Sequence, residues 1–167
     1  MVPNKWYPNA IFMNCNTAHF AFEEIKKKSQ APLVNLVEET VKKLAQANPV
    51  RVGLVASDGC LQGKVYERYF KEYLPQTQIV YPDQNHQRMV TKGICNVKNR
   101  HRFDPPYDVC SPEYIFSEVC NDLRRKGVDR IILGCTDIRV GFHEHSSDLI
   151  DSLFVMRDLI IEASRNE

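Results

Sequence analysis

Short apolar runs of strand length recur along this chain and alternate with segments of helical periodicity. The runs occupy residues 10–13, 33–36, 50–55, 79–81 and 131–133. A short run without polar alternation is typical of a strand covered on both faces, as in a parallel sheet. The helical segments between the runs would supply the right-handed crossovers that parallel strands need. The sequence therefore predicts an α/β fold.

Helical periodicity and one chain break predict how the fold is divided. Apolar residues three to four positions apart predict helices around residues 20–25, around 37–44, over 61–73, around 115–123 and over 148–164. Asn48-Pro49 ends the second of these helices. We expect a first domain formed by residues 1–48 and 148–167, and a second formed by residues 49–147. The first has only two strands, too few to bury both sheet faces, so we expect it to be incomplete at its N-terminus.

Composition and charge exclude several classes of protein. The 22 basic and 21 acidic residues nearly cancel, which gives no general attraction to nucleic acid or anionic membranes. No apolar stretch approaches the roughly 20 residues that span a bilayer, and residues 1–8 lack the apolar core of a signal peptide. The six cysteines are thinly spread, which favours free thiols and a cytoplasmic protein. The sequence lacks the closely spaced Cys or His pairs that are typical of zinc sites, so we expect no metal.

Two cysteines occupy matching positions at strand ends. Cys15 follows the run at 10–13 and Cys135 follows the run at 131–133, each just before a polar helix start. The carboxyl ends of parallel strands are where open α/β sheets bind ligands, and helix N-termini there lower a thiol pKa. Inversion of a carbon centre by proton transfer needs a base on one face and an acid on the other. The cysteine pair therefore predicts a racemase.

Polar neighbours of the two thiols are candidate binding groups. Asn16, Thr17 and Thr136 could donate to a substrate carboxylate or to an enolate-like oxygen, and helix capping is the alternative role for each. His19 could assist proton exchange with solvent, or it could be a packing or capping histidine. Cys60 also follows a strand and could be a third thiol near the cleft, or a small residue that fills space.

These residues carry a resemblance to a known family. Two segments resemble the signature motifs of the aspartate/glutamate racemase family: Cys15-Asn16-Thr17-Ala18-His19 and Gly134-Cys135-Thr136-Asp137-Ile138. The segment at 52–59 resembles the start of that family's second domain. The resemblance implies two pseudo-symmetric α/β domains and racemisation of an acidic amino acid, aspartate or glutamate, without a cofactor.

The resemblance also implies roles for individual residues. Cys15 and Cys135 would be the two catalytic thiols, while Asn16, Thr17 and Thr136 would hold the substrate's α-carboxylate and amino groups. Lys92 resembles the family lysine that approaches the acidic side chain. Family members begin with two further strands and a glycine-rich loop, which this sequence lacks, and Asp137 stands where glutamate is commoner. We therefore expect an N-terminally truncated relative.

Two rival hypotheses remain open on the sequence. One is a catalytically silent relative that binds an acidic ligand or a protein partner. The other is a different enzyme on the same scaffold, such as a decarboxylase or a cis-trans isomerase of small diacids. Those enzymes need only one thiol, so the matched pair counts against them. An exposed apolar face left by the missing strands would also favour a homo-oligomer.

Overall fold

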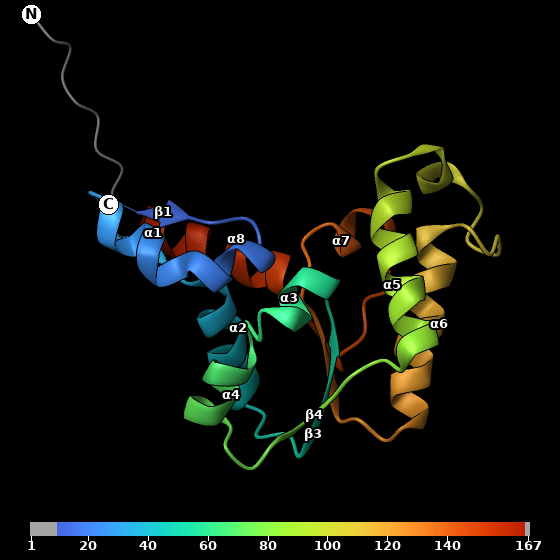
Figure 1. Cartoon of the computed structure of the whole chain (residues 1–167), viewed down its shortest axis with the longest axis horizontal. Coiled ribbons are helices and arrows are strands. Elements are labelled where there is room, and N and C mark those ends of the chain that lie inside the picture. Colours follow the sequence, from blue (N-terminus) through green and yellow to red (C-terminus); the bar gives the residue numbers. More distant parts are fainter. Residues whose placement is uncertain (1–9, 166–167) are drawn as a thin grey trace, which may run out of the picture.

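The computed structural model describes residues 10–165, which form two parallel sheets with helices around them (Figure 1). The strands are β1 (Ile11–Phe12), β2 (Leu33–Val34), β3 (Arg51–Val55), β4 (Gln78–Val80), β5 (Arg130–Leu133) and β6 (Leu149–Asp151). The α-helices are α1 (Phe22–Lys28), α2 (Leu36–Ala45), α3 (Asp58–Gln62), α4 (Glu67–Tyr73), α5 (Gln84–Val97), α6 (Pro112–Arg125), α7 (Ile138–Gly141) and α8 (Ser152–Arg165). Two 3-10 helices, η1 (Thr17–Ala21) and η2 (Arg100–Phe103), complete the set. The predicted α/β fold is confirmed.

The larger sheet has the strand order β4-β3-β5-β6, with every pair parallel. Successive residues of a strand point to opposite faces, so β3 buries Leu54 in one core and Val55 in the other. Helices α2 and α4 cover the Leu54 face, while α5 and α6 cover the Val55 face, on opposite sides of the sheet in Figure 1. Burial on both faces explains why these strands read as continuous apolar runs.

Local signals in the sequence fix where the main helices begin and end. The side chain of Asn35 accepts the Glu38 N–H at 3.0 Å and caps α2, and Ser111 accepts the Tyr114 N–H at 3.1 Å and caps α6. Beyond α6, Gly127 adopts φ +72°, a conformation that glycine reaches without strain. The chain can therefore turn sharply into β5.

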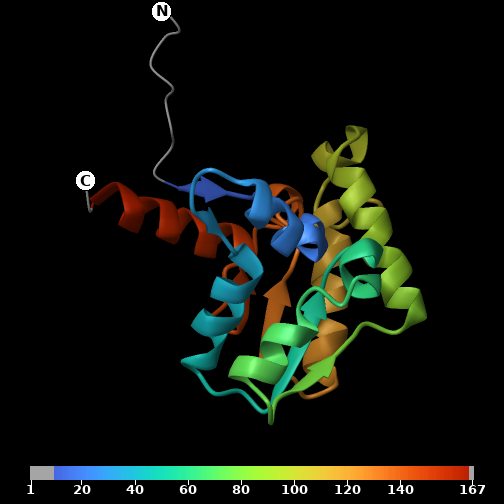
Figure 2. The same cartoon turned by 60° about the vertical axis from the view of Figure 1, so that its left-hand side comes forward.

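The smaller sheet consists of β1 and β2 in parallel register, Ile11 opposite Leu33. Helix α8 leaves the larger sheet and runs beside this small one (Figure 2). Val155 and Met156 of α8 are buried with Leu36, and Phe12 of β1 packs against them. This apolar cluster joins the first and last parts of the described chain.

Two predicted helices differ from the structure, and one helix of the structure was not predicted. The helix expected over residues 148–164 begins only at Ser152, because Leu149–Asp151 forms β6 beside β5. The helix expected over 61–73 is split into α3 and α4 at Lys64, whose φ of 48° interrupts helical geometry. Helix α5 was not predicted, since its buried side combines Val90 and Val97 with Gly93 and Asn96.

The expected domain boundaries stay predictions, and residues 1–9 and 166–167 of the expected first domain lie outside the described residues. Within residues 10–165, every helix is too short or too polar to cross a bilayer.

Candidate active site

Cys15 and Cys135 both lie just beyond the carboxyl ends of parallel strands. Cys15 lies between β1 and η1 and is exposed, while Cys135 lies between β5 and α7 and is half-buried. A thiolate at Cys15 raises the pKa of Cys135, and thiolates at both positions add to the raised pKa of Cys60. Cys135 and Cys60 are therefore within electrostatic reach of Cys15, although burial is the largest cause of the raised pKa at both. A charge on one thiol disfavours a charge on the next, which suits a pair in which one member is protonated.

Several groups act on the Cys135 thiol. Burial raises its pKa, and this is the largest effect. The backbone N–H of Asp137 and the ammonium of Lys98 act in the opposite direction, because both stabilise the thiolate. The turn into α7 thus brings a hydrogen-bond donor to the sulfur, as expected for a cysteine at a strand-to-helix turn.

Lys98, not Lys92, is the lysine beside the second cysteine motif. The ammonium of Lys98 lies 2.8 Å from Asp137 Oδ2 and acts on the thiol of Cys135. Lys92 lies on α5, before Lys98, and instead places Nζ 3.6 Å from Cys110 Sγ. Lys98 was not among the site residues expected from the sequence. The sequence holds no signal for this, because the position of Lys98 beside Asp137 depends on the direction in which α5 runs.

Asn16 is buried, and its side-chain amide is engaged within the protein. Its Oδ1 accepts the hydroxyl proton of Tyr66 at 2.7 Å, and its Nδ2 donates to Ser152 Oγ at 3.0 Å. The residue is 2% exposed. The role expected for Asn16 in substrate binding stays a prediction.

Two threonines and a third thiol surround the cysteines. The Thr17 hydroxyl lies 2.8 Å from that of Ser57, which caps α3, so the loop after Cys15 is joined to the end of β3. Thr136 is half-buried beside Cys135. Cys60 is buried in α3, and burial raises its pKa to about 12. The Cys60 thiol is therefore protonated at neutral pH and unsuited to act as a base there.

His19 is buried, and both of its ring nitrogens have backbone partners. Nδ1 lies 2.8 Å from the carbonyl oxygen of Cys15, and Nε2 accepts the N–H of Leu36 at 3.1 Å. The ring also stacks on Phe22, with centroids 5.6 Å apart. This geometry matches the capping role considered for His19 and leaves neither nitrogen directed at the Cys15 sulfur.

One group in the described part of the chain could hold a metal ion. Asp83, His86 and Asp122 each place a ligand atom within 4.8 Å of the others. The ammonium of Lys126 already lies 2.5 Å from Asp122 Oδ2 and 3.5 Å from Asp83 Oδ2, so a protein cation occupies this place. The group begins α5, whereas Lys98 follows its other end. Asp83 and His86 therefore lie at the end of α5 opposite to Lys98.

Comparison with known proteins decides the family. The model of the Asp/Glu/Hydantoin racemase family matches residues 4–155. The chain belongs to that family. The resemblance read from the two cysteine motifs is confirmed at this level.

Relatives with stated activities cover most of this chain. A broad specificity amino-acid racemase of Bacillus subtilis (strain 168), RacX, is 26% identical over 145 residues, which are 85% of this chain and 59% of RacX. The structure of an aspartate racemase from Picrophilus torridus superimposes with a TM-score of 0.73 at 26% identity, over 93% of this chain and 62% of that one. The chain thus spans about three fifths of the length of these two proteins.

A comparison with a more distant structure supports the fold and nothing further. Glutamate racemase RacE1 of Bacillus anthracis superimposes with a TM-score of 0.68 at 18% identity, over 95% of this chain and 59% of that one. Together with the family match, these likenesses identify an amino-acid racemase fold.

Proposed function

We propose that this protein racemises an acidic amino acid by cofactor-independent transfer of the α-proton between Cys15 and Cys135. The observation that carries the proposal is the pair of thiols just beyond the carboxyl ends of parallel strands, one between β1 and η1 and the other between β5 and α7. One thiolate would remove the α-proton from one face, and the other thiol would return a proton to the opposite face. The roles exchange for the other enantiomer.

The difference in burial between the two thiols supports different roles for them, one as the acid and one as the base. Cys15 is exposed, whereas burial raises the pKa of Cys135. In the resting protein, Cys135 would therefore hold its proton and act as the acid, which leaves the role of base to Cys15. The N–H of Asp137 and the ammonium of Lys98 would then stabilise the Cys135 thiolate after it has given up its proton.

Lys98 also supports an acidic substrate. Its ammonium is mostly exposed and already holds the Asp137 carboxylate, so a second carboxylate could share it. Lys98 therefore replaces Lys92 in our proposal as the cation that faces the substrate side chain. Thr17 and Thr136, one from each cysteine motif, are proposed to bind the α-carboxylate and amino groups.

A conversion assay tests this proposal. The protein is incubated separately with L- and D-aspartate and with L- and D-glutamate, and the opposite enantiomer is measured by chiral chromatography. Conversion in both directions for one of the two pairs is expected, and that pair names the substrate. Cys95→Ser, which removes an exposed thiol of α5, is the matched control and is expected to retain activity. Absence of conversion in all four reactions with folded protein would favour the silent binding protein instead.

A homo-oligomer also stays a proposal. Phe20 of η1 and Ile160 and Ile161 of α8 are exposed, at 73%, 43% and 41%. Burial of such apolar side chains is the usual driving force for self-association. The molar mass from light scattering would decide between a monomer and a defined oligomer.

A further inference from the structure

Ser152 lies between the segment that carries Cys15 and the segment that carries Cys135, and it forms a hydrogen bond to each. Its Oγ accepts a hydrogen bond from Asn16 Nδ2 at 3.0 Å and donates one to the carbonyl oxygen of Leu133 at 3.0 Å. Asn16 directly follows Cys15, and Leu133 ends β5 two residues before Cys135. Ser152 itself is fully buried at the start of α8. The Ser152 hydroxyl therefore connects the residue after Cys15 to the end of the strand that precedes Cys135.

Tyr66 extends this connection and fixes its direction. Its hydroxyl donates to Asn16 Oδ1, and burial raises the pKa of Tyr66 well above its ordinary value, so the group is a permanent donor. Because the Leu133 carbonyl can only accept, Ser152 donates to it and accepts from Asn16, so the nitrogen of the Asn16 amide faces Ser152 and its oxygen faces Tyr66. The order Tyr66 to Asn16 to Ser152 to Leu133 is a buried chain in which each hydroxyl has one acceptor.

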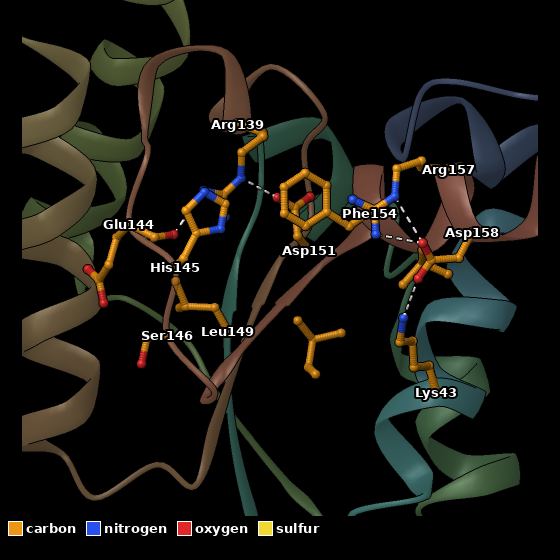
Figure 3. A pocket seen from close by; sticks show the side chains of 12 residues that line it. Lys43, Arg139, Glu144, His145, Ser146, Leu149, Asp151, Phe154, Arg157 and Asp158 are labelled. Carbon is orange, nitrogen blue, oxygen red and sulfur yellow. Dashed lines mark hydrogen bonds and ion pairs between the residues drawn. The ribbon is translucent and has the colours of Figure 1, made fainter. Parts of the chain in front are cut away.

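The residue before Ser152 holds the other side of the Cys135 loop. Asp151 Oδ2 accepts from Arg139 Nε of α7, and the two side chains are only 4% and 9% exposed. Arg139 also donates to the carbonyl oxygens of Phe142 and Glu144. Figure 3 shows this ion pair at the wall of a hollow of about 400 Å³ beside Phe154. Asp151 and Ser152 thus hold the Cys135 loop before and after its cysteine.

We propose that Ser152 is a positioning residue, whose hydroxyl sets the spacing between Cys15 and Cys135. The inference rests on the proposed function, because spacing matters only if both thiols serve one carbon. Proton transfer requires each sulfur to come within hydrogen-bond reach of that carbon, and a displacement of about 1 Å can cost on the order of 100-fold in rate. Ser152 touches no reacting atom and acts through Asn16 and Leu133.

Substitution of Ser152 separates positioning from simple stabilisation. In Ser152→Ala, Asn16 Nδ2 and the Leu133 oxygen lose their shared partner, so the two loops can move independently. We expect kcat to fall by about tenfold or more while KM changes by less than about twofold. Ser152→Thr retains the hydroxyl and is expected to recover most of kcat. Ser164→Ala, an exposed hydroxyl on the same helix, is the matched control.

Thiol alkylation supplies a readout that does not depend on racemase activity. Iodoacetamide modification of each cysteine is followed by peptide mass spectrometry in the wild type and in Ser152→Ala. We expect the Cys135 rate to rise by at least about threefold through local opening, while the rates of exposed Cys95 and core Cys120 stay unchanged.

Two results of these experiments would overturn the proposal. An unchanged kcat together with an unchanged Cys135 rate would overturn the proposal. An equal acceleration at Cys120 would also overturn it, because it would indicate general loosening of the fold. If the wild type converts none of the amino acids, the proposed function fails by itself, and the ratio of the Cys135 rate to the Cys120 rate still decides whether Ser152 holds the loops.

Discussion

His19 fastens the loop that carries Cys15 to the beginning of α2. Its Nε2 accepts the N–H of Leu36, so the ring proton must lie on Nδ1, which donates to the carbonyl oxygen of Cys15 2.8 Å away. The neutral ring satisfies one donor at a helix N-terminus and one acceptor in the loop. A protonated ring could not accept from Leu36, and this makes the loop sensitive to pH.

Acid is therefore expected to weaken the fold through His19. Burial lowers the pKa of His19 below its ordinary value near 6.5. The unfolded chain then binds the proton more readily than the folded one, so the stabilisation is complete above about pH 6.5 and is lost as pH falls through the folded-state pKa. Urea unfolding at pH 7.5 and pH 5.0 measures the loss.

Two variants isolate this effect. His19→Gln is expected to lower the free energy of unfolding at pH 7.5 by about 1–3 kcal/mol, because two buried hydrogen bonds are disturbed, and to flatten the pH dependence. His143→Gln replaces a histidine whose side chain is 75% exposed and is the control. Equal pH dependence in the wild type and His19→Gln would refute the assignment.

Lys98→Gln is expected to slow alkylation of Cys135. The substitution removes a cation that lowers the pKa of this thiol and leaves the Asp137 carboxylate, which raises it, without its partner. The thiolate fraction at pH 8 should fall, and the rate with it, by about two- to threefold given the exposure of Lys98. Lys92→Gln, beside Cys110, is the matched control. If Lys92→Gln slowed Cys135 as much as Lys98→Gln, the choice between the two lysines would be wrong.

Tyr66→Phe should destabilise the protein, although it removes only one oxygen atom from the core. It removes the hydroxyl that Asn16 Oδ1 accepts from, and a buried acceptor without a partner costs about 1–3 kcal/mol. Chemical unfolding measures the difference. Tyr107→Phe, on a side chain that is 81% exposed, should change stability by less than about 0.5 kcal/mol. A loss below that value for Tyr66→Phe would mean that the buried chain through Ser152 contributes little.

Gly93→Ala should disrupt the contact between α5 and α6. A Cβ at this position would lie 2.8 Å from Phe116 Cζ and 3.0 Å from Ile115 Cγ2, closer than packed atoms allow. Overpacking of this kind costs about 1–3 kcal/mol. A lowered melting temperature is expected, with Gln84→Ala at an exposed position of the same helix as the control. An unchanged melting temperature would show that α5 and α6 accommodate the added methyl group without loss of stability.

The sequence predicted those parts of the fold that carry a strong periodic signal. The runs at 50–55 and 131–133 became β3 and β5 because burial on both faces leaves no polar alternation. Strand β6 was missed because Asp151 is followed at once by the first residue of α8, with no turn residue between them. Helix α5 was missed because its buried side includes Gly93 and Asn96, which a count of apolar residues does not register.

The candidate site was predicted less completely than the fold. Cys15 and Cys135 stand out because each follows an apolar run, but nothing in the sequence ties Ser152 to both. That link spans 136 positions between Asn16 and Ser152 and depends on how α8 packs. Lys98 was overlooked for a similar reason, since its nearness to Asp137 follows from the direction of α5.

The most direct test of the two-thiol account is proton NMR in D₂O with the enantiomers of the substrate, comparing the wild type with Cys15→Ser and Cys135→Ser. The account predicts that the wild type replaces the α-proton by deuterium as it inverts either enantiomer, and that neither serine variant inverts either one. Inversion that persists in a serine variant would contradict the account, as would inversion by the wild type that keeps the original α-proton throughout.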